Sequence, residues 1–197
     1  MKTAPSALTP FLRSDAQGAV LAETMLDPTQ ELSISEISRR TGLLPAVAHR
    51  EVTRLIDADV LRDRREGNNR LVRANTEHPL WAPMSQIITE TYGPEPLLRA
   101  LLSHVPGVDK AYIYGSWAAR RTGQTGPPPR DLDVLVVGNP SRSTLLDVAE
   151  GAGHRLHTEV NIHRASPDAW HTQTDPFLAT VTSRPLITLI DDEEHHA

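Results

Sequence analysis

The feature that most constrains this chain is DLDVLVVG, residues 131–138, where two aspartates stand at the start of an aliphatic run. Such a run is typical of a buried β-strand. Because side chains alternate along a strand, Asp131 and Asp133 are expected on one face, and Leu132 and Val134 on the other. Two carboxylates on one face repel each other unless a cation lies between them, and Mg²⁺ is a natural candidate because it prefers oxygen ligands. The alternative is a capped turn that enters an ordinary strand.

A predicted strand at residues 109–115, DKAYIYG, ends in glycine and is followed by a predicted short helix at 116–121, SWAARR. The free backbone N–H groups at the start of a helix, together with its dipole, favour an anion. Gly115 lets the backbone approach a phosphate closely, and the Ser116 hydroxyl can donate to that phosphate. Arg120, one turn into the helix, either reaches the phosphate or lies on a solvated face.

A further predicted strand, RLHTEVNIH at 155–163, carries Glu159, which could complete a set of three carboxylates. Such a set can hold two metal ions, one activating an attacking hydroxyl and one binding phosphates. The Pro-rich loop RTGQTGPPP at 121–129 has no assigned role. We expect the last stretch, DDEEHHA at 191–197, to be a solvated acidic end without a site.

Capping patterns mark two helices in the first half of the chain. Ser14 stands three residues before Gln17, and Ser33 stands three residues before Glu36, which is the spacing of a capping box. A glycine-containing turn ends the second helix, and a third helix follows from Pro45, a residue that suits a first helical turn. Apolar residues recur with helical spacing in each segment. Two short helices around such a turn predict a helix-turn-helix.

Two strand-like segments follow, on either side of EGNN at residues 66–69, which favours a tight turn. A helix-turn-helix followed by a basic hairpin predicts a winged helix. Residues of the third helix that lie off its buried stripe are expected in the major groove of DNA. These residues are Pro45, Ala46, His49, Arg50, Thr53 and Arg54. The hairpin arginines Arg64, Arg65 and Arg70 are expected to reach phosphates or the minor groove. The alternative is a winged helix that serves only protein binding or dimerisation.

An apolar stripe in helical register runs through residues 81–91 and stops at a Gly-Pro pair, residues 93–94. It predicts a connecting helix, and such helices often form dimer interfaces, although the stripe can equally pack on its own domain. We therefore expect two domains, residues 1–92 and 93–197, and a homodimer. The second domain is expected to run helix, strand, helix, loop, strand, helix, strand, and then a less regular tail.

Composition narrows the function classes. The chain has 197 residues and a formal net charge of -5, which argues against a nucleic-acid coat, but residues 50–73 hold seven arginines and five acidic residues. A patch of this kind can contact phosphate even on an acidic protein. No run approaches the roughly 18 apolar residues of a membrane span, and the N-terminus lacks the apolar segment of a secretory signal. The absence of cysteine excludes disulfides and thiolate metal sites. We expect a cytoplasmic protein.

Residues 11–81 resemble the ArsR-like winged-helix regulators. The resemblance is carried by RTGL at 40–43, Pro45, Glu51, Arg54-Leu55, RREGN at 64–68, RAN at 73–75 and HPL at 78–80. It implies a winged-helix fold that binds DNA. The metal-sensing members of that family use cysteines, so thiolate metal sensing does not carry over to this chain. Asp59 stands where the resemblance leads us to expect glycine at a helix end.

The motifs YGSWA and DLD, followed by a strand glutamate, resemble the signature of the polymerase-beta-like nucleotidyltransferase superfamily in its minimal form. The resemblance implies transfer of a nucleoside monophosphate from an NTP to a hydroxyl acceptor. It further implies that Asp131, Asp133 and Glu159 hold two Mg²⁺ ions. Gly115 and Ser116 would hold the triphosphate.

This second resemblance covers residues 94–168 and departs from the family at two positions. Arg130 stands where the family often has serine, and it either contacts the triphosphate or pairs with Asp131 and hinders metal binding. Glu159 replaces the commoner aspartate.

Taken together, the sequence predicts an α+β protein with an N-terminal winged helix-turn-helix and a small mixed-sheet nucleotidyltransferase domain. We expect a DNA-binding transcriptional regulator with Mg²⁺-dependent transferase activity on an NTP. Minimal transferases of this kind are similar to antitoxins that adenylylate a toxin, so a separate protein is a candidate acceptor. The alternative is a transcription factor whose second domain is catalytically silent and senses a nucleotide.

Overall fold

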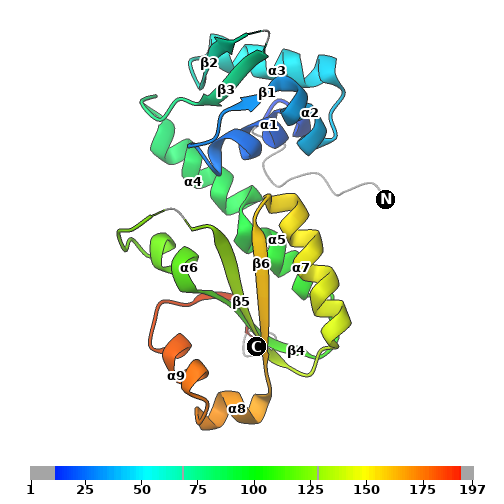
Figure 1. The fold of residues 1–197 in the computed structure, drawn as a ribbon, viewed down its shortest axis with the longest axis vertical. Coiled ribbons are helices and arrows are strands. Elements are labelled where there is room, and N and C mark those ends of the chain that lie inside the picture. The colour runs from blue at the N-terminus through cyan, green and yellow to red at the C-terminus, as the bar shows by residue number, and fades with distance from the viewer. Residues whose placement is uncertain (1–11, 68, 128, 192–197) are drawn as a thin grey trace. The chain divides into compact units, whose positions relative to one another are not determined.

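The computed structural model of the protein describes residues 12–67, 69–127 and 129–191 as an α+β fold with two separate sheets (Figure 1). The chain divides into two compact units, Met1–Gly93 and Pro94–Ala197, called here the N-terminal and the C-terminal unit. None of the helices in the described part of the chain is long and apolar enough to cross a bilayer.

The N-terminal unit combines four helices with a three-stranded antiparallel sheet. Its elements are α1 (Asp15–Met25), β1 (Leu32–Ser33), α2 (Ile34–Thr41), α3 (Pro45–Asp57), β2 (Leu61–Glu66), β3 (Asn69–Ala74) and α4 (Trp81–Tyr92). The sheet has the order β1-β3-β2, with β2 and β3 joined as a hairpin. Apolar residues of all four helices and all three strands form one core.

The capping spacings correspond to real hydrogen bonds. The Ser14 hydroxyl accepts from the backbone N–H of Gln17 at 3.2 Å, and Ser33 accepts from Glu36 N–H at 3.2 Å. Gly42 ends α2 in the left-handed conformation, at φ 69°. Side-chain caps satisfy backbone donors that the first turn of a helix leaves free, so these starts follow from local chemistry.

The apolar stripe of α4 packs on its own unit. Trp81, Met84 and Tyr92 contact the N-terminal core, and Ile88 is buried within it. Ile87 remains 49% exposed. The stripe is therefore largely used inside the unit, and the homodimer expected from it stays a prediction, to be tested by the mass in sedimentation equilibrium.

Asp59 does adopt the conformation for which the resemblance leads us to expect glycine. Its φ is 57°, in the left-handed region that non-glycine residues seldom occupy. The buried Asn75 donates its side-chain N–H to the Asp59 carbonyl at 2.8 Å. That bond holds the turn between α3 and β2 in place despite the cost of the conformation.

The C-terminal unit is built on a mixed four-stranded sheet of order β6-β5-β4-β7. Its elements are α5 (Pro94–Leu102), β4 (Val108–Tyr114), α6 (Gly115–Arg121), β5 (Asp131–Gly138), α7 (Arg142–Leu156), β6 (Glu159–Ala165), α8 (Pro167–Thr172), α9 (Pro176–Thr182) and β7 (Ile187–Asp191). β5 and β6 are parallel, and β4 is antiparallel to β5 and β7. The crossover helix α7 makes the parallel pairing possible.

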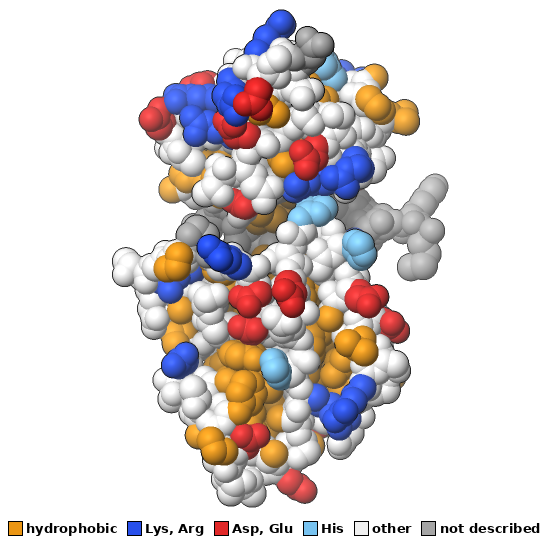
Figure 2. Space-filling view, in the orientation of Figure 1, with side chains coloured by type: hydrophobic (Ala, Val, Ile, Leu, Met, Phe, Trp, Pro, Cys, Tyr) orange, Lys and Arg blue, Asp and Glu red, His pale blue; other side chains and the backbone are white. Residues whose placement is uncertain are grey.

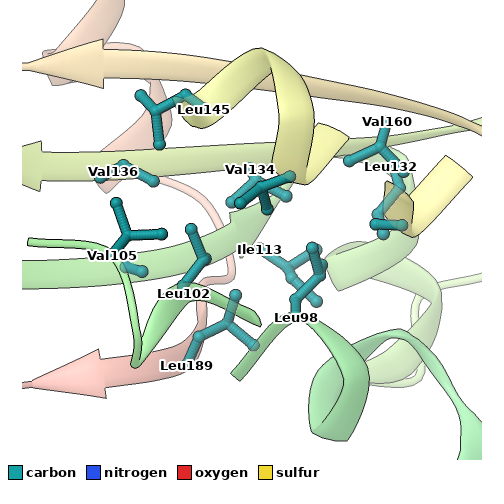
Figure 3. Close-up of a cluster of buried hydrophobic side chains, with 13 residues drawn as sticks. Leu98, Leu102, Val105, Ile113, Leu132, Val134, Val136, Leu145, Val160 and Leu189 are labelled. Atoms are coloured by element: carbon teal, nitrogen blue, oxygen red, sulfur yellow. The ribbon is translucent and has the colours of Figure 1, made fainter. Parts of the chain in front are cut away.

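The two faces of this sheet are covered differently. On one face, α5 and α7 pack over Ile113, Leu132, Val134 and their neighbours, as the side chains in Figure 3 show. On the other face, a smaller cluster formed around Leu135 packs against residues of α8 and α9. The second face also carries the two aspartates of β5, and we call it the carboxylate face.

Two expectations are corrected at the end of the chain. The strand expected from residue 155 begins only at Glu159, because α7 continues to Leu156 and His157 closes it in the left-handed conformation at φ 52°. The expectation of a less regular tail is wrong, because the chain after β6 forms α8, α9 and the edge strand β7. Asp191, the last residue of β7, pairs with Lys110 at 2.5 Å. The rest of the acidic end, residues 192–197, lies outside the described residues.

Candidate functional site

The strand β5 places Asp131 and Asp133 together on the carboxylate face. Leu132, between them, is 1% exposed and lies in the core on the opposite face. In the parallel register with β6, Asp131 is beside Glu159 and Asp133 is beside Asn161. The alternation of the strand places the two aspartates on one face, and this register brings the backbone of Glu159 beside Asp131.

Asp133 lies where a negative charge is poorly compensated. Burial raises the pKa of Asp133, and the charges of Asp131 and Glu159 raise it further. A hydrogen bond with Asn161 and the nearby His163 offset only part of this rise. A cation at the pair would relieve the repulsion, so the donor set of Asp131 and Asp133 fits a hard metal ion such as Mg²⁺.

Glu159 does not join that pair as a third ligand. Its side chain is exposed, and the described residues contain no group of three or more His, Asp or Glu side chains placed to hold a metal. Glu159 instead lines an open depression of about 610 Å³ along the C-terminal half of α7, with Glu150, His154 and His157. The register brings the backbone of Glu159 to the site, but its carboxylate does not converge with the two aspartates.

Gly115 is pressed against the carboxylate of Asp133. It has φ 73°, and a Cβ atom built on it would lie 2.6 Å from Asp133 Oδ2. The left-handed backbone favours glycine at this position, and a side chain there would displace the Asp133 carboxylate. Ser116, the next residue, is exposed at the start of α6. The β4–α6 junction and the aspartate pair thus form one contiguous surface.

The two predicted phosphate-binding arginines lie apart from that surface or at its edge. The guanidinium of Arg120 donates to the Gln124 carbonyl and packs against Gly126 of the following loop. In this structure Arg120 therefore contacts the loop that follows α6. Arg130 is exposed, and within the described residues no ion pair joins it to Asp131. Its carbonyl accepts from the Thr158 hydroxyl at 3.1 Å, so Arg130 leaves the aspartate pair accessible.

Aromatic rings beside the aspartates were missed by sequence reasoning. His163 and Phe177 have ring centroids 5.2 Å apart, and Tyr114 lies 5.9 Å from Phe177 and 6.2 Å from His163. We call these three residues the ring cluster. Figure 2 shows acidic side chains gathered on one face of the C-terminal unit with hydrophobic side chains beside them. The available signal was the alternation of β6, which puts His163 on the face of Asn161.

The exposed face of α3 matches the predicted DNA-contacting set with one exception. Pro45, Ala46, His49, Arg50 and Arg54 are exposed. Thr53 is different, because its hydroxyl oxygen is buried and has no hydrogen-bond partner among the described atoms. The Thr53 side chain is thus partly buried, and its contact with DNA stays a prediction.

A buried glutamate, Glu51, pairs with arginines of this face, and sequence reasoning did not identify it as their partner. Glu51 is 1% exposed, and its carboxylate bonds the guanidinium of Arg13 and accepts from Arg54 at 3.3 Å. Arg50 lies 3.6 Å from the same carboxylate. Burial raises the pKa of Glu51, but the Arg13 hydrogen bond and the three positive charges outweigh it, so the net pKa is lowered. The three half-exposed arginines share one buried counter-charge.

The hairpin is less basic than its arginines suggest. Arg64 pairs with Glu31 at 2.6 Å and with Glu66 at 3.2 Å. Arg70 pairs with Asp63 at 2.6 Å. Arg65 is exposed and forms no ion pair in the described ranges. Of the predicted wing contacts, only Arg65 offers an uncompensated charge.

Neither the protein-family models nor the curated proteins gave a match to this chain. Two solved structures are similar to part of it. One is a crystal structure of a toxin-antitoxin with AMP-PNP, at a TM-score of 0.37 and 15% identity over 52% of this chain and 77% of that chain. The other is a tri-AMPylated HEPN toxin from Shewanella oneidensis in complex with an MNT antitoxin, at a TM-score of 0.32 and 15% identity over 51% of this chain and 68% of that chain.

Proposed function

We propose that the C-terminal unit is a nucleotidyltransferase that moves a nucleoside monophosphate from an NTP to a hydroxyl acceptor. The observation that carries the proposal is the contact between Gly115 and the Asp133 carboxylate, beside Asp131. A bare backbone next to a pair of poorly compensated carboxylates suits a triphosphate with its metal ions, because the backbone can approach phosphate and the carboxylates can take the metal.

The residues of the site would bind the metal ions and the triphosphate. Asp131 and Asp133 would hold Mg²⁺, and Glu159 would complete a two-ion site after its side chain turns from solvent. Mg²⁺ supplies activation of the acceptor hydroxyl and neutralisation of phosphate charge. Ser116 would donate its hydroxyl to the triphosphate, and the exposed Arg130 would add a positive charge at the edge.

The acceptor is proposed to be a separate macromolecule. On the carboxylate face, α8 and α9 pack around Leu135, whereas Ser116, Arg130 and His163 near the aspartates are exposed. An open face suits the hydroxyl of a protein side chain better than a small molecule, which needs an enclosing pocket. A toxin partner, as in toxin-antitoxin systems, is the form of this proposal that we favour.

The test is label transfer from each of four α-³²P NTPs to macromolecules of a cell lysate, with Mg²⁺. We expect label on one or a few species, lost in Asp131→Asn and Asp133→Asn. The matched control is Asp147→Asn, which makes the same charge change at an exposed position on α7. The expected loss is at least about 100-fold, since each aspartate would contact the metal.

A catalytically silent nucleotide sensor is the alternative. Its expected result is nucleotide binding that depends on both aspartates, with no label on any acceptor under the same conditions. Transfer that survives Asp133→Asn would overturn the assignment of the site.

We further propose that the N-terminal unit is a winged helix that binds DNA through α3. The observation in favour is the set of exposed, compact residues around Arg50 and Arg54, which suits a groove. In a salt series, Arg50→Ala/Arg54→Ala should reduce the slope of log affinity against log salt by about 2. Arg142→Ala/Arg155→Ala is the matched control, because it removes two exposed arginines from α7 of the C-terminal unit. An unchanged slope in the double variant would show that α3 does not face DNA.

A further inference from the structure

The ring cluster has no part in the transfer chemistry proposed above. Tyr114 is 9% exposed, and burial raises its pKa, with the charges of Asp133 and Asp131 adding to the rise, so its hydroxyl stays neutral. The other two rings are open to solvent: His163 is exposed, and Phe177 exposes 38% of its surface. Two exposed rings thus lie on a buried one, at the edge of the carboxylate face.

The ring cluster is continuous with the aspartate pair. Tyr114 is the register partner of Asp133 across β4 and β5. Asn161 hydrogen-bonds to Asp133, and His163 is near enough to affect the pKa of that carboxyl by its charge. His163 therefore lies between the aspartate pair and Phe177 as a link along the carboxylate face.

Phe177 is held in place before any ligand arrives. Phe177 lies in the first turn of α9, where Asp175 caps the helix by accepting from Phe177 N–H at 2.8 Å. The ring of Phe177 also meets Tyr114 edge-on, with an interplanar angle of 81°. A ring fixed in this way loses little conformational freedom when a flat group stacks on it.

We propose that His163 and Phe177 bind the nucleobase of the NTP by stacking. The inference rests on the proposed transferase function and extends it to the part of the substrate that the aspartates do not touch. Nucleobases stack on phenylalanine and histidine rings regardless of their hydrogen-bonding edges. The ring cluster is therefore a base-tolerant subsite, and purines bind there more tightly than pyrimidines because they offer more stacking area.

The test compares two probes by isothermal titration of the full chain with Ca²⁺ present to limit turnover: ATP, which has a base, and tripolyphosphate, which has none. Phe177→Ala and His163→Ala should each weaken ATP binding by about 10-fold to 100-fold and change tripolyphosphate binding by less than about 2-fold. Phe177→Trp should retain ATP binding, since it keeps a ring. Leu146→Ala, which removes a 64% exposed apolar side chain from α7, is the matched control.

Phe177→Leu provides a second variant should truncation to alanine unfold α9, because it keeps an apolar side chain and loses the ring. Unchanged ATP affinity in the folded Phe177 and His163 variants would overturn the base subsite. An equal loss of ATP and tripolyphosphate would also overturn it. If Asp133→Asn abolishes ATP binding while the ring variants do not, the transferase proposal stands without this subsite. If the unsubstituted chain binds neither probe, both proposals fail.

Discussion

Gly115 and Asp133 show how a single backbone position controls the candidate site. The carboxylate occupies the space that a side chain at position 115 would need, and the backbone there is left-handed. A change at this glycine therefore acts on the aspartate directly, without passing through the core. The same contact leaves Asp133 half-buried, which is why its charge is poorly solvated.

Gly115→Ala should destabilise the C-terminal unit by about 1–3 kcal/mol, since a strained left-handed residue carries a cost of that order. Urea unfolding followed by far-UV circular dichroism measures this. Gly151→Ala is the matched control: Gly151 lies within α7 with nothing within 4 Å of the added Cβ. It should stabilise by about 0.5–1 kcal/mol because alanine favours helix. Equal effects of the two changes would contradict the contact described at Gly115.

Asp133→Asn should stabilise the metal-free protein at neutral pH. The folded pKa of Asp133 is raised, so the native state binds the proton more readily than the unfolded chain. Stability then falls as pH rises from the unfolded pKa of about 3.9 through the folded pKa, and the cost remains in full above it. Asparagine has no such cost, and the difference between the two proteins should vanish in acid.

Urea unfolding in EDTA between pH 3.5 and 8 tests this sign. Asp147→Asn, exposed on α7, is the control and should show no gain. Added Mg²⁺ should stabilise the unsubstituted protein, because a ligand of the native state alone shifts unfolding, and should not stabilise Asp133→Asn. A gain of stability for the unsubstituted carboxylate on raising the pH would contradict the raised pKa.

At the scale of elements, α3 differs from the simple amphipathic helix that its apolar spacing suggests. Ala48, Val52 and Leu55 form the buried stripe, but Glu51 is buried beside them. Arg13, which precedes α1, and Arg50 and Arg54 of α3 itself supply the counter-charges. The ion pair with Arg13 thereby connects α3 to the segment before α1. The same carboxylate also pairs with Arg50 and Arg54, the arginines proposed to face DNA.

Glu51→Gln should destabilise the N-terminal unit at neutral pH by about 2 kcal/mol, since hydrogen bonds to charged groups contribute about 1.5–3 kcal/mol. The folded pKa of Glu51 is lowered, so its stabilisation is present above the unfolded pKa of about 4.3 and is lost as pH falls through the folded pKa. The difference in stability between variant and unsubstituted protein should therefore close in acid, as for Asp133, but it has the opposite sign at neutral pH.

Asp57→Asn serves as the control on the same helix, because Asp57 is exposed at its last residue. Chemical unfolding across the same pH range measures both variants. A gap for Glu51→Gln that is constant with pH would show that the carboxylate is not held by the arginines.

At the scale of the whole molecule, the two units have separate cores and different charge. The core of the N-terminal unit is formed by residues up to Tyr92, and that of the C-terminal unit begins with α5. The first 93 residues hold 11 basic and 12 acidic residues, whereas the remainder holds 9 and 13. The C-terminal unit therefore carries most of the negative charge, whereas the N-terminal unit is nearly neutral.

Fragments 1–93 and 94–197 should each fold with a cooperative unfolding transition, because each unit buries a core of its own. Fragment 1–93 should retain DNA in a mobility-shift experiment, and fragment 94–197 should retain ATP in isothermal titration. Circular dichroism of the two fragments is the first measurement. A fragment that stays unfolded alone would contradict the division of the chain at residue 93.

Much of the fold could be predicted because its causes are local. A serine hydroxyl three residues from the N–H it accepts sets the starts of α1 and α2. Alternation along β5 places Asp131 and Asp133 opposite the core-facing Leu132. The same local rules failed at His157, where α7 ends later than the strand pattern suggested.

By itself, the sequence determined the order of most elements and the face on which the two aspartates stand, because helix caps and strand alternation act over a few residues. Only the tertiary structure decided which charges are compensated. Arg64 is neutralised by Glu31, 33 residues away in the chain, and Glu51 is buried against Arg13, 38 residues away. It alone brought Phe177 to His163 and Gly115 to Asp133. Such pairings depend on how separate elements pack, and the periodicity of residues along the chain does not indicate which distant residues come into contact.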